Sequence, residues 1–123
     1  MNNDLKLTIV VPIYNVEQYL EQCLDSLVNQ SNHDFKVIMV DDGSKDKSGE
    51  IAQKYAEKFP ERFFYVYKEN AGLGAARNTG MEYCDTEYIE FLDSDDWLLP
   101  RTVELVLDLS LIHISEPTRH AQI

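Results

Sequence analysis

The sequence predicts an α/β fold in which a mostly parallel sheet is covered by helices on both faces. Four short runs are mainly apolar and rich in β-branched or aromatic side chains, at residues 8–13, 35–40, 63–67 and 88–92. Such runs are typical of strands that are buried on both faces of a sheet. After each run, apolar residues recur at helical spacing. Strands that alternate with helices require right-handed crossovers, so neighbouring strands are expected to run parallel.

The first strand is predicted at residues 8–13, and the first helix directly after it. Pro12 lies near the end of the run, where a strand is about to leave the sheet. Asn15 and Gln18 have the spacing of a capping box, which predicts that the helix begins after Asn15. The buried stripe of this helix is predicted to contain Val16, Leu20, Cys23, Leu24, Leu27 and Val28.

The later elements follow the same alternation. After the second strand, Ser44 or Asp46 can cap a second helix that Pro60 closes. The segment at residues 70–81 is rich in glycine and alanine and predicts a third helix, and Pro100 suits the first turn of a fourth. The apolar positions of these three helices are Ile51, Ala52, Tyr55, Ala56 and Phe59, then Ala75, Ala76, Thr79 and Tyr83, then Val103, Val106 and Leu107.

Length and charge exclude several classes of protein. The 123 residues allow one domain, and the net charge of −11 argues against a protein that coats nucleic acid or an anionic membrane. Cys23 and Cys84 match no zinc or redox spacing, which favours a reducing compartment. The N-terminus does not read as a signal peptide, and no apolar stretch reaches the roughly 20 residues of a membrane span. We therefore expect a cytoplasmic protein without a nucleic-acid partner.

Residues 109–123 (LSLIHISEPTRHAQI) resemble the in-frame translation of a transposase adaptor used in sequencing-library preparation. We therefore expect a natural domain at residues 1–108 and a non-native tail at residues 109–123, which is set aside in reasoning about the fold. The alternative is a natural C-terminal helix that runs on to Pro117.

Polar residues gather after each predicted strand, and ligands of open parallel sheets bind beyond the carboxyl ends of the strands. After the fourth strand, Asp93-Ser94-Asp95-Asp96 brings three carboxylates together. A hard divalent cation such as Mg²⁺ or Mn²⁺ offsets their repulsion and leaves coordination positions for ligand phosphates. The alternative is that Asp95 or Asp96 caps the following helix.

Two further clusters allow both a structural and a functional interpretation. In Asp41-Asp42-Gly43-Ser44, a carboxylate can accept the imide N–H of a uracil or the hydroxyls of a ribose, or the residues can form only a tight turn. Gly72 and Gly74 let the backbone approach a phosphate at the start of a helix. Arg77 can reach a phosphate or a base, or form a structural ion pair. Tyr14 can stack on a base or lie at the rim.

Four motifs in this order resemble the nucleotide-binding half of the family 2 glycosyltransferases. They are TIVVPIYN, VDDGSKD, ENAGLGAARNTG and YIEFLDSDDW, and they extend over nearly all of residues 1–108. The resemblance implies a three-layer, Rossmann-like GT-A fold, here truncated. It also implies an inverting transfer of a hexosyl group from a UDP-sugar or another nucleotide-sugar. The acceptor would be a hydroxyl of a glycan or glycolipid, in polysaccharide or glycoconjugate synthesis.

The resemblance also assigns roles to individual residues. It implies that Tyr14 and Asp41 hold the base and that Arg77 reaches toward the nucleotide. Asp42 belongs to the same motif as Asp41. The acidic motif would contact the ribose and hold Mn²⁺ or Mg²⁺, with Asp95 as the direct ligand. The implied donor-binding residues are Pro12, Tyr14, Asn15, Asp41, Asp42, Gly72, Arg77, Asp93 and Asp95, and the implied metal-binding residues are Asp93, Asp95 and Asp96.

The catalytic part of such an enzyme is expected outside this sequence. In the family, the general base is an Asp or Glu well beyond the acidic motif, in the acceptor-binding half, so no catalytic residue is assigned here. We expect the polypeptide as given to bind nucleotide weakly or not at all and to transfer no sugar. Membrane association would be possible only through that later part.

Two other functions stand as alternatives. A non-catalytic nucleotide-binding module could have the same fold without turnover. A flavodoxin-like or dinucleotide-binding domain is disfavoured, because the loop at residues 12–18 (PIYNVEQ) has no glycine to admit a pyrophosphate.

Overall fold

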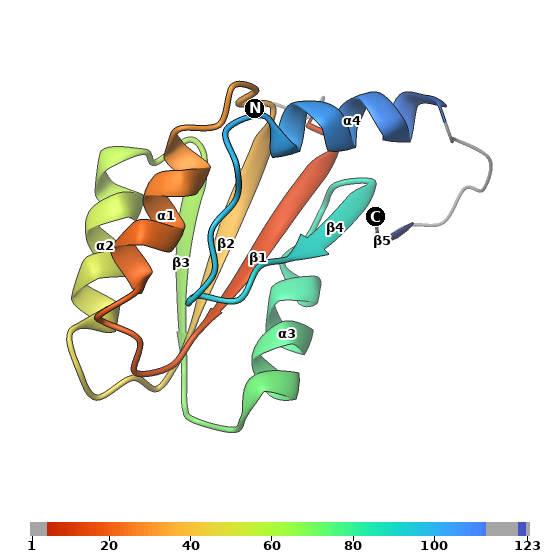
Figure 1. The fold of residues 1–123 in the computed structure, drawn as a ribbon. Helices are drawn as coiled ribbons and strands as arrows, with labels where there is room; N and C mark the ends of the chain where they lie inside the picture. Colours follow the sequence, from red (N-terminus) through yellow and green to blue (C-terminus); the bar gives the residue numbers. More distant parts are fainter. Residues whose placement is uncertain (1–4, 113–120, 123) are drawn as a thin grey trace.

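The computed structural model describes residues 5–112 and 121–122, with side chains as far as residue 109. Strands and helices alternate along the chain as the sequence predicts (Figure 1). Their order is β1 (Leu7–Ile13), α1 (Leu20–Val28), β2 (Phe35–Asp42), α2 (Ser48–Lys58), β3 (Phe63–Lys68), α3 (Leu73–Glu82), β4 (Tyr88–Phe91), α4 (Thr102–Ile112) and β5 (Ala121–Gln122).

The sheet has the strand order β3-β2-β1-β4-β5, and its neighbouring strands pair in parallel. In β1, Leu7 pairs with Phe35 of β2 on one side and with Tyr88 of β4 on the other. The chain therefore builds outward from β1 to β3 and then crosses to the opposite side of β1 to form β4. Such a reversal leaves a crevice beyond the carboxyl ends of β1 and β4, where doubly wound folds bind ligands.

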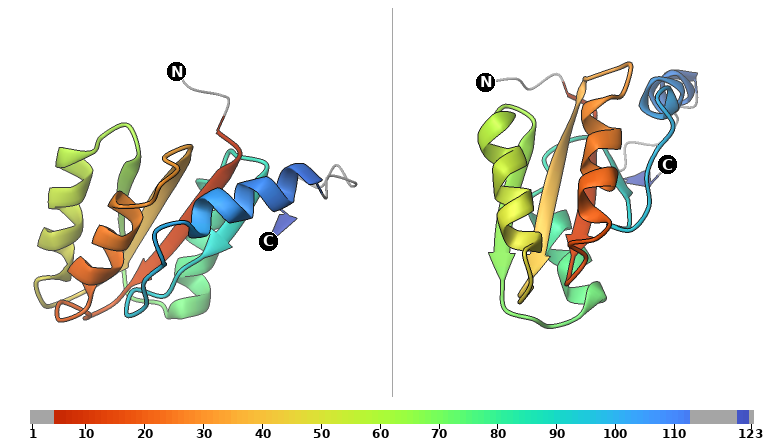
Figure 2. Two further views of the ribbon diagram at one scale, coloured as in Figure 1. Left: turned by 45° about the horizontal axis from the view of Figure 1, so that its top comes forward. Right: turned by 60° about the vertical axis from the view of Figure 1, so that its left-hand side comes forward.

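Helices cover both faces of the sheet, which gives three layers (Figure 2). Alternate residues of β1 point to opposite faces. Ile9 and Val11 pack in the cluster formed with α1, α2 and the first turn of α4, whereas Val10 packs against Ala76 of α3. This double burial explains why the predicted strands are apolar at nearly every position.

The α3 helix lies unusually close to the sheet. A Cβ atom at Gly80 would lie only 2.3 Å from Cγ1 of Val10. Glycine is therefore required at this position because there is no space for a Cβ atom, and not because of its backbone angles. This close approach explains the glycine at position 80 of the helix.

The predicted start of the first helix is wrong. The helix begins at Leu20, after a turn in which the backbone N–H groups of Tyr19 and Leu20 donate to the carbonyl of Val16. Asn15 does not cap it: its φ is 50°, and its side-chain oxygen accepts the backbone N–H of Lys45 at 2.8 Å. A contact between two loops therefore decides the conformation of Asn15, and sequence spacing alone does not contain that contact.

The predicted cap of the second helix is also wrong. The N-cap of α2 is Lys47, which makes no side-chain capping hydrogen bond, and Asp46 lies one residue before it and accepts the backbone N–H of Ser48 at 2.9 Å. Ser44 has another role, because its hydroxyl accepts the backbone N–H of Asn15 at 3.0 Å. Pro100 lies in the turn just before α4, which begins at Thr102, and not in the first turn of the helix as predicted.

Part of the expected non-native tail, residues 113–120 and 123, lies outside the described residues. Within the described part, α4 continues to Ile112, and Ala121–Gln122 pairs with β4. No helix in the described part of the chain is both long and apolar enough to span a membrane.

Candidate nucleotide and metal site

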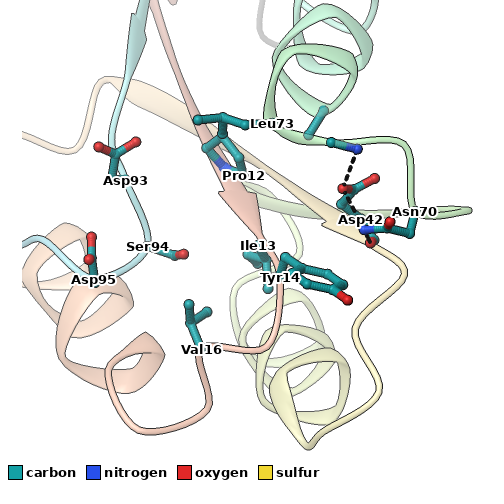
Figure 3. A pocket seen from close by; sticks show the side chains of 12 residues that line it. Pro12, Ile13, Tyr14, Val16, Asp42, Asn70, Leu73, Asp93, Ser94 and Asp95 are labelled. Atoms are coloured by element: carbon teal, nitrogen blue, oxygen red, sulfur yellow. Dashed lines mark hydrogen bonds between the residues drawn. The ribbon is translucent and has the colours of Figure 1, made fainter.

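A cavity of about 350 Å³ opens where β1, β2 and β4 end (Figure 3). It lies at the reversal of strand order, where the fold predicts a ligand. Asp93, Ser94 and Asp95 lie on one side of it, and Asp42 and Asn70 lie on the other. The lining residues are Pro12, Ile13, Tyr14, Val16, Asp42, Asn70, Gly72, Leu73, Ala76, Asp93, Ser94 and Asp95.

The structure brings most, but not all, of the predicted donor-binding residues to this cavity. Those that line it are Pro12, Tyr14, Asp42, Gly72, Asp93 and Asp95. Asn15 lines a neighbouring hollow, which Asp95 also borders. Asp41 and Arg77 line neither hollow. Their predicted contacts with a nucleotide stay predictions.

Asp41 and Asp42 are adjacent in β2 but point to opposite faces of the sheet. Asp41 is 2% exposed, accepts the hydroxyl of Tyr65 at 2.6 Å and accepts the backbone N–H of Ser44 at 2.9 Å. A Cβ atom at Gly49 would lie 2.8 Å from Oδ2 of Asp41, so the carboxylate is packed beneath the start of α2. Both of its oxygens are committed to the chain itself.

Asp42 organises the loop that leads into α3. Its carboxylate accepts the backbone N–H groups of Ala71 and Gly72, each at 2.9 Å. It also accepts the Lys68 ammonium at 3.1 Å and the side-chain amide of Asn70 at 3.0 Å. Burial acts to raise the pKa of Asp42, but these donors together hold it below its ordinary value. The ionised form of Asp42 is therefore built into the wall of the cavity.

Asp93, Asp95 and Asp96 form an exposed acidic cluster after β4. Each can offer a carboxylate oxygen, and these oxygens lie within 4.8 Å of one another. The helix-cap alternative is wrong, because α4 begins only at Thr102. Three converging carboxylate oxygens are the donor set that Mg²⁺ and Mn²⁺ prefer. The residues present therefore fit a hard divalent cation.

Arg77 joins α3 to this cluster. Its Nη2 lies 3.5 Å from Oδ1 of Asp93, and its guanidinium lies over the ring of Phe91 at 5.6 Å. Nε of Arg77 is buried and has no hydrogen-bond partner among the described residues. The structural ion pair considered from the sequence is therefore formed, and it neutralises part of the charge on one of the three acids.

The cluster creates a negative potential that reaches into the core. Cys23 of α1 is fully buried, as its place on the apolar stripe predicts, and its thiol donates to the carbonyl of Asp93 at 3.8 Å. Burial, followed by the charges of Asp96, Asp95 and Asp93, raises the pKa of this thiol to about 12. The same potential attracts a cation to the surface above it.

Comparison with known proteins identifies the family. Residues 8–110 match the family model described as glycosyl transferase family 2. The chain belongs to this family. The resemblance seen in its motifs is confirmed, and so is the expected GT-A fold.

Among family 2 relatives, the chain is 48% identical to glycosyltransferase GlyA of Streptococcus pneumoniae over 82% of its length, and 46% identical to putative glycosyltransferase EpsH of Bacillus subtilis over 82%. It covers 14% and 29% of these two relatives. Among solved structures, it superposes on residues 1–349 of S. aureus TarS in complex with UDP with a TM-score of 0.80 and 31% identity. That match covers 88% of this chain and 32% of the TarS chain.

Several lining residues of this family 2 domain were not predicted. Asn70 lies within the motif ENAGLGAARNTG and Ser94 within YIEFLDSDDW, so their place in those motifs was the available signal. Leu73, which is exposed, and Ala76, which is buried, lie one turn apart on α3 and carry no chemical signature. The cavity therefore has polar groups at two ends and an apolar wall between them, which suits a ligand that has both a flat ring and charged groups.

Proposed function

We propose that this chain is the nucleotide-sugar-binding part of an inverting glycosyltransferase. The donor is a UDP-sugar or another nucleotide-sugar, and a hexosyl group passes to a hydroxyl of a glycan or glycolipid in polysaccharide or glycoconjugate synthesis. Family membership supports this proposal, and so does the likeness to TarS, whose structure is a complex with UDP. We place the protein in the cytoplasm, with any membrane association carried by other parts of the full-length protein.

The observation that carries the proposal is the position of the acidic cluster at one end of the cavity. The volume of about 350 Å³ lies in the range of small-molecule sites. A base would lie toward Tyr14, whose ring is 45% exposed, and the diphosphate would lie toward Asp93 and Asp95. The rigid loop held by Asp42 would shape the end that receives the base.

Mn²⁺ or Mg²⁺ is proposed as the cofactor, held by Asp95 with support from Asp93 and Asp96. Asp95 is the best direct ligand because Asp96 does not line the cavity and because Asp93 shares its charge with Arg77. When bound, the ion acts as a Lewis acid that stabilises the negative charge developing on the leaving diphosphate. Arg77 keeps Asp93 oriented and limits repulsion within the cluster.

We further propose that this chain does not contain the general base. Asp42 is engaged by backbone and side-chain donors, and the three clustered acids are the proposed ligands of a cation. An inverting displacement needs a base about 3 Å from the acceptor hydroxyl. The chain as given is therefore expected to transfer no sugar and to bind its donor weakly.

Titration of the ¹⁵N-labelled chain with UDP, with and without Mg²⁺, tests this function. We expect weak, Mg²⁺-dependent binding that shifts the backbone amides of Gly72 and residues 93–96. Asp95→Asn should abolish the Mg²⁺ dependence. Asp34→Asn is the matched control, because Asp34 is exposed and directly precedes β2 at the opposite edge of the sheet. The proposal would be contradicted if UDP bound with the same affinity with and without Mg²⁺, in both the wild type and Asp95→Asn.

A further inference from the structure

The acidic cluster lies on a segment without regular structure, so something else must fix its position. Residues 92–101 connect β4 to α4. The segment is tied to the sheet at its start, where the backbone N–H of Leu92 donates to the carbonyl of Val10 at 3.0 Å. Between Asp93 and Leu98, the hydrogen bonds of its backbone to other elements, among the described residues, go to α1. From Leu99 to Arg101 they go to Gln30, to Ser31 and to the N–H groups of Thr102 and Leu105 in α4.

One edge of α1 binds this segment at successive turns of the helix. The thiol of Cys23 donates to the carbonyl of Asp93, and the hydroxyl of Ser26 accepts the backbone N–H of Leu98 at 3.1 Å. Beyond the last turn, the side-chain amide of Gln30 donates to the carbonyl of Leu99 at 2.7 Å. The spacing of three residues places Cys23 and Ser26 on one face of α1, and Gln30, two residues beyond the helix, contacts the same segment.

Gln30 is the strongest of these ties. Its side chain is 2% exposed, and its oxygen accepts the backbone N–H of Val103 at 2.9 Å while its nitrogen also donates to the carbonyl of Ser26 at 3.0 Å. A buried amide whose donors and acceptor are all satisfied fixes its partners strictly, because any displacement leaves a polar group unpaired. It therefore fixes the path of the chain into α4.

Asp95 and Asp96 lie between two of these ties, at Asp93 and Leu98. Their side chains are exposed, and the short backbone span between the two fixed points is closed by a turn in which the N–H of Asp96 donates to the carbonyl of Asp93 at 2.9 Å. The backbone that carries the three carboxylates is thus positioned by α1 and not by α4, while Arg77 of α3 holds the side chain of Asp93.

We propose that Ser26 and Gln30 are positioning residues for the divalent cation, which rests on the proposed function. They hold the carboxylates at the separation that a small octahedral ion needs, without touching the ion or the nucleotide. Mg²⁺ demands a strict octahedral geometry, and Mn²⁺ is closer to it in size than Ca²⁺, which accepts longer and more variable distances. Loosening the ties should therefore weaken binding of the small ions more than binding of Ca²⁺.

The test measures binding of Mn²⁺ alone to the full chain by electron paramagnetic resonance, with Ca²⁺ as a competitor. Ser26→Ala should raise the Kd for Mn²⁺ about tenfold, the lower end of the loss seen when supporting hydrogen bonds at metal sites are removed. The Kd for Ca²⁺ should change less, and Ser26→Thr, which keeps the hydroxyl, should restore the Mn²⁺ preference. Gln30→Met should shift the preference further in the same direction.

Tyr55→Phe is the matched control. It removes a hydrogen bond from the hydroxyl of Tyr55 to Asp25, which ties α1 to α2 and not to the acidic segment. We expect this variant to lose stability without a change in the ratio of the Mn²⁺ and Ca²⁺ constants. If Gln30→Met does not fold, the comparison of Ser26→Ala with Ser26→Thr decides alone.

The outcomes separate this inference from the function on which it rests. If the wild-type chain binds no Mn²⁺, or if Asp95→Asn binds it as well as wild type, the proposed function fails. If Asp95→Asn loses Mn²⁺ but Ser26→Ala keeps wild-type affinity and selectivity, the function stands and the positioning role of α1 is overturned.

Discussion

The carboxylate of Asp42 accepts the backbone N–H of Gly72 at 2.9 Å and thereby joins the end of β2 to the start of α3. Gly72 has a φ of 101°, which glycine adopts without strain. The wall of the cavity thus depends on one ionised side chain and on one residue without a Cβ atom. This arrangement makes the shape of the site sensitive to the charge of a single residue.

Asp42→Asn should destabilise the protein. An amide cannot accept two backbone N–H groups and an ammonium as a carboxylate does, and hydrogen bonds to charged groups contribute about 1.5–3 kcal/mol. We expect a loss of this size in urea unfolding at pH 7. Asp85→Asn is the control, because Asp85 is exposed and its ion pair with Lys36 should contribute less than about 1 kcal/mol.

The same variant gives a prediction for pH dependence. Because the folded state lowers the pKa of Asp42 below the unfolded value of about 3.9, its contribution is complete above that pH. It is lost as the pH falls through the folded pKa. The difference in unfolding free energy between wild type and Asp42→Asn should therefore shrink toward pH 3. A difference that stays constant from pH 7 to pH 3 would show that ionisation is not responsible.

Two glycines of α3 should respond in opposite ways to substitution by alanine. At Gly80 the new Cβ would lie 2.3 Å from the buried side chain of Val10, and such overpacking costs about 1–3 kcal/mol. At Gly74 nothing lies within 4 Å, so Gly74→Ala should stabilise the helix by up to about 1 kcal/mol. Thermal unfolding of both variants measures the contrast. Equal effects would mean that α3 can move away from the sheet.

Tyr14 offers a prediction about the base. If its exposed ring stacks on a base, Tyr14→Ala should weaken UDP binding roughly tenfold, since base–aromatic stacking contributes about 1–3 kcal/mol. Stability should barely change, because the side chain is 45% exposed. Tyr83→Ala removes another exposed tyrosine, which lies outside the cavity, and serves as the control for the UDP titration. An unchanged affinity would place the base elsewhere.

Strand existence and order along the chain were predictable because the apolar runs are buried on both faces. The start of α1 was not, since the conformation of Asn15 depends on Lys45 and Ser44, which are distant in sequence. The burial of Asp41 could have been predicted from the sequence. β2 extends through Asp42, and alternation along the strand places Asp41 on the same face as Met39.

The placement of Asp41 and Asp42 on opposite faces has a consequence for natural variation. The two residues meet different requirements. Substitutions of Asp41 act on the packing beneath the start of α2, whereas substitutions of Asp42 act on the loop before α3 as well as on stability. A substitution at one position does not change the requirement at the other. A survey of tolerated variants should therefore find the two positions varying independently, although both are aspartates in one motif.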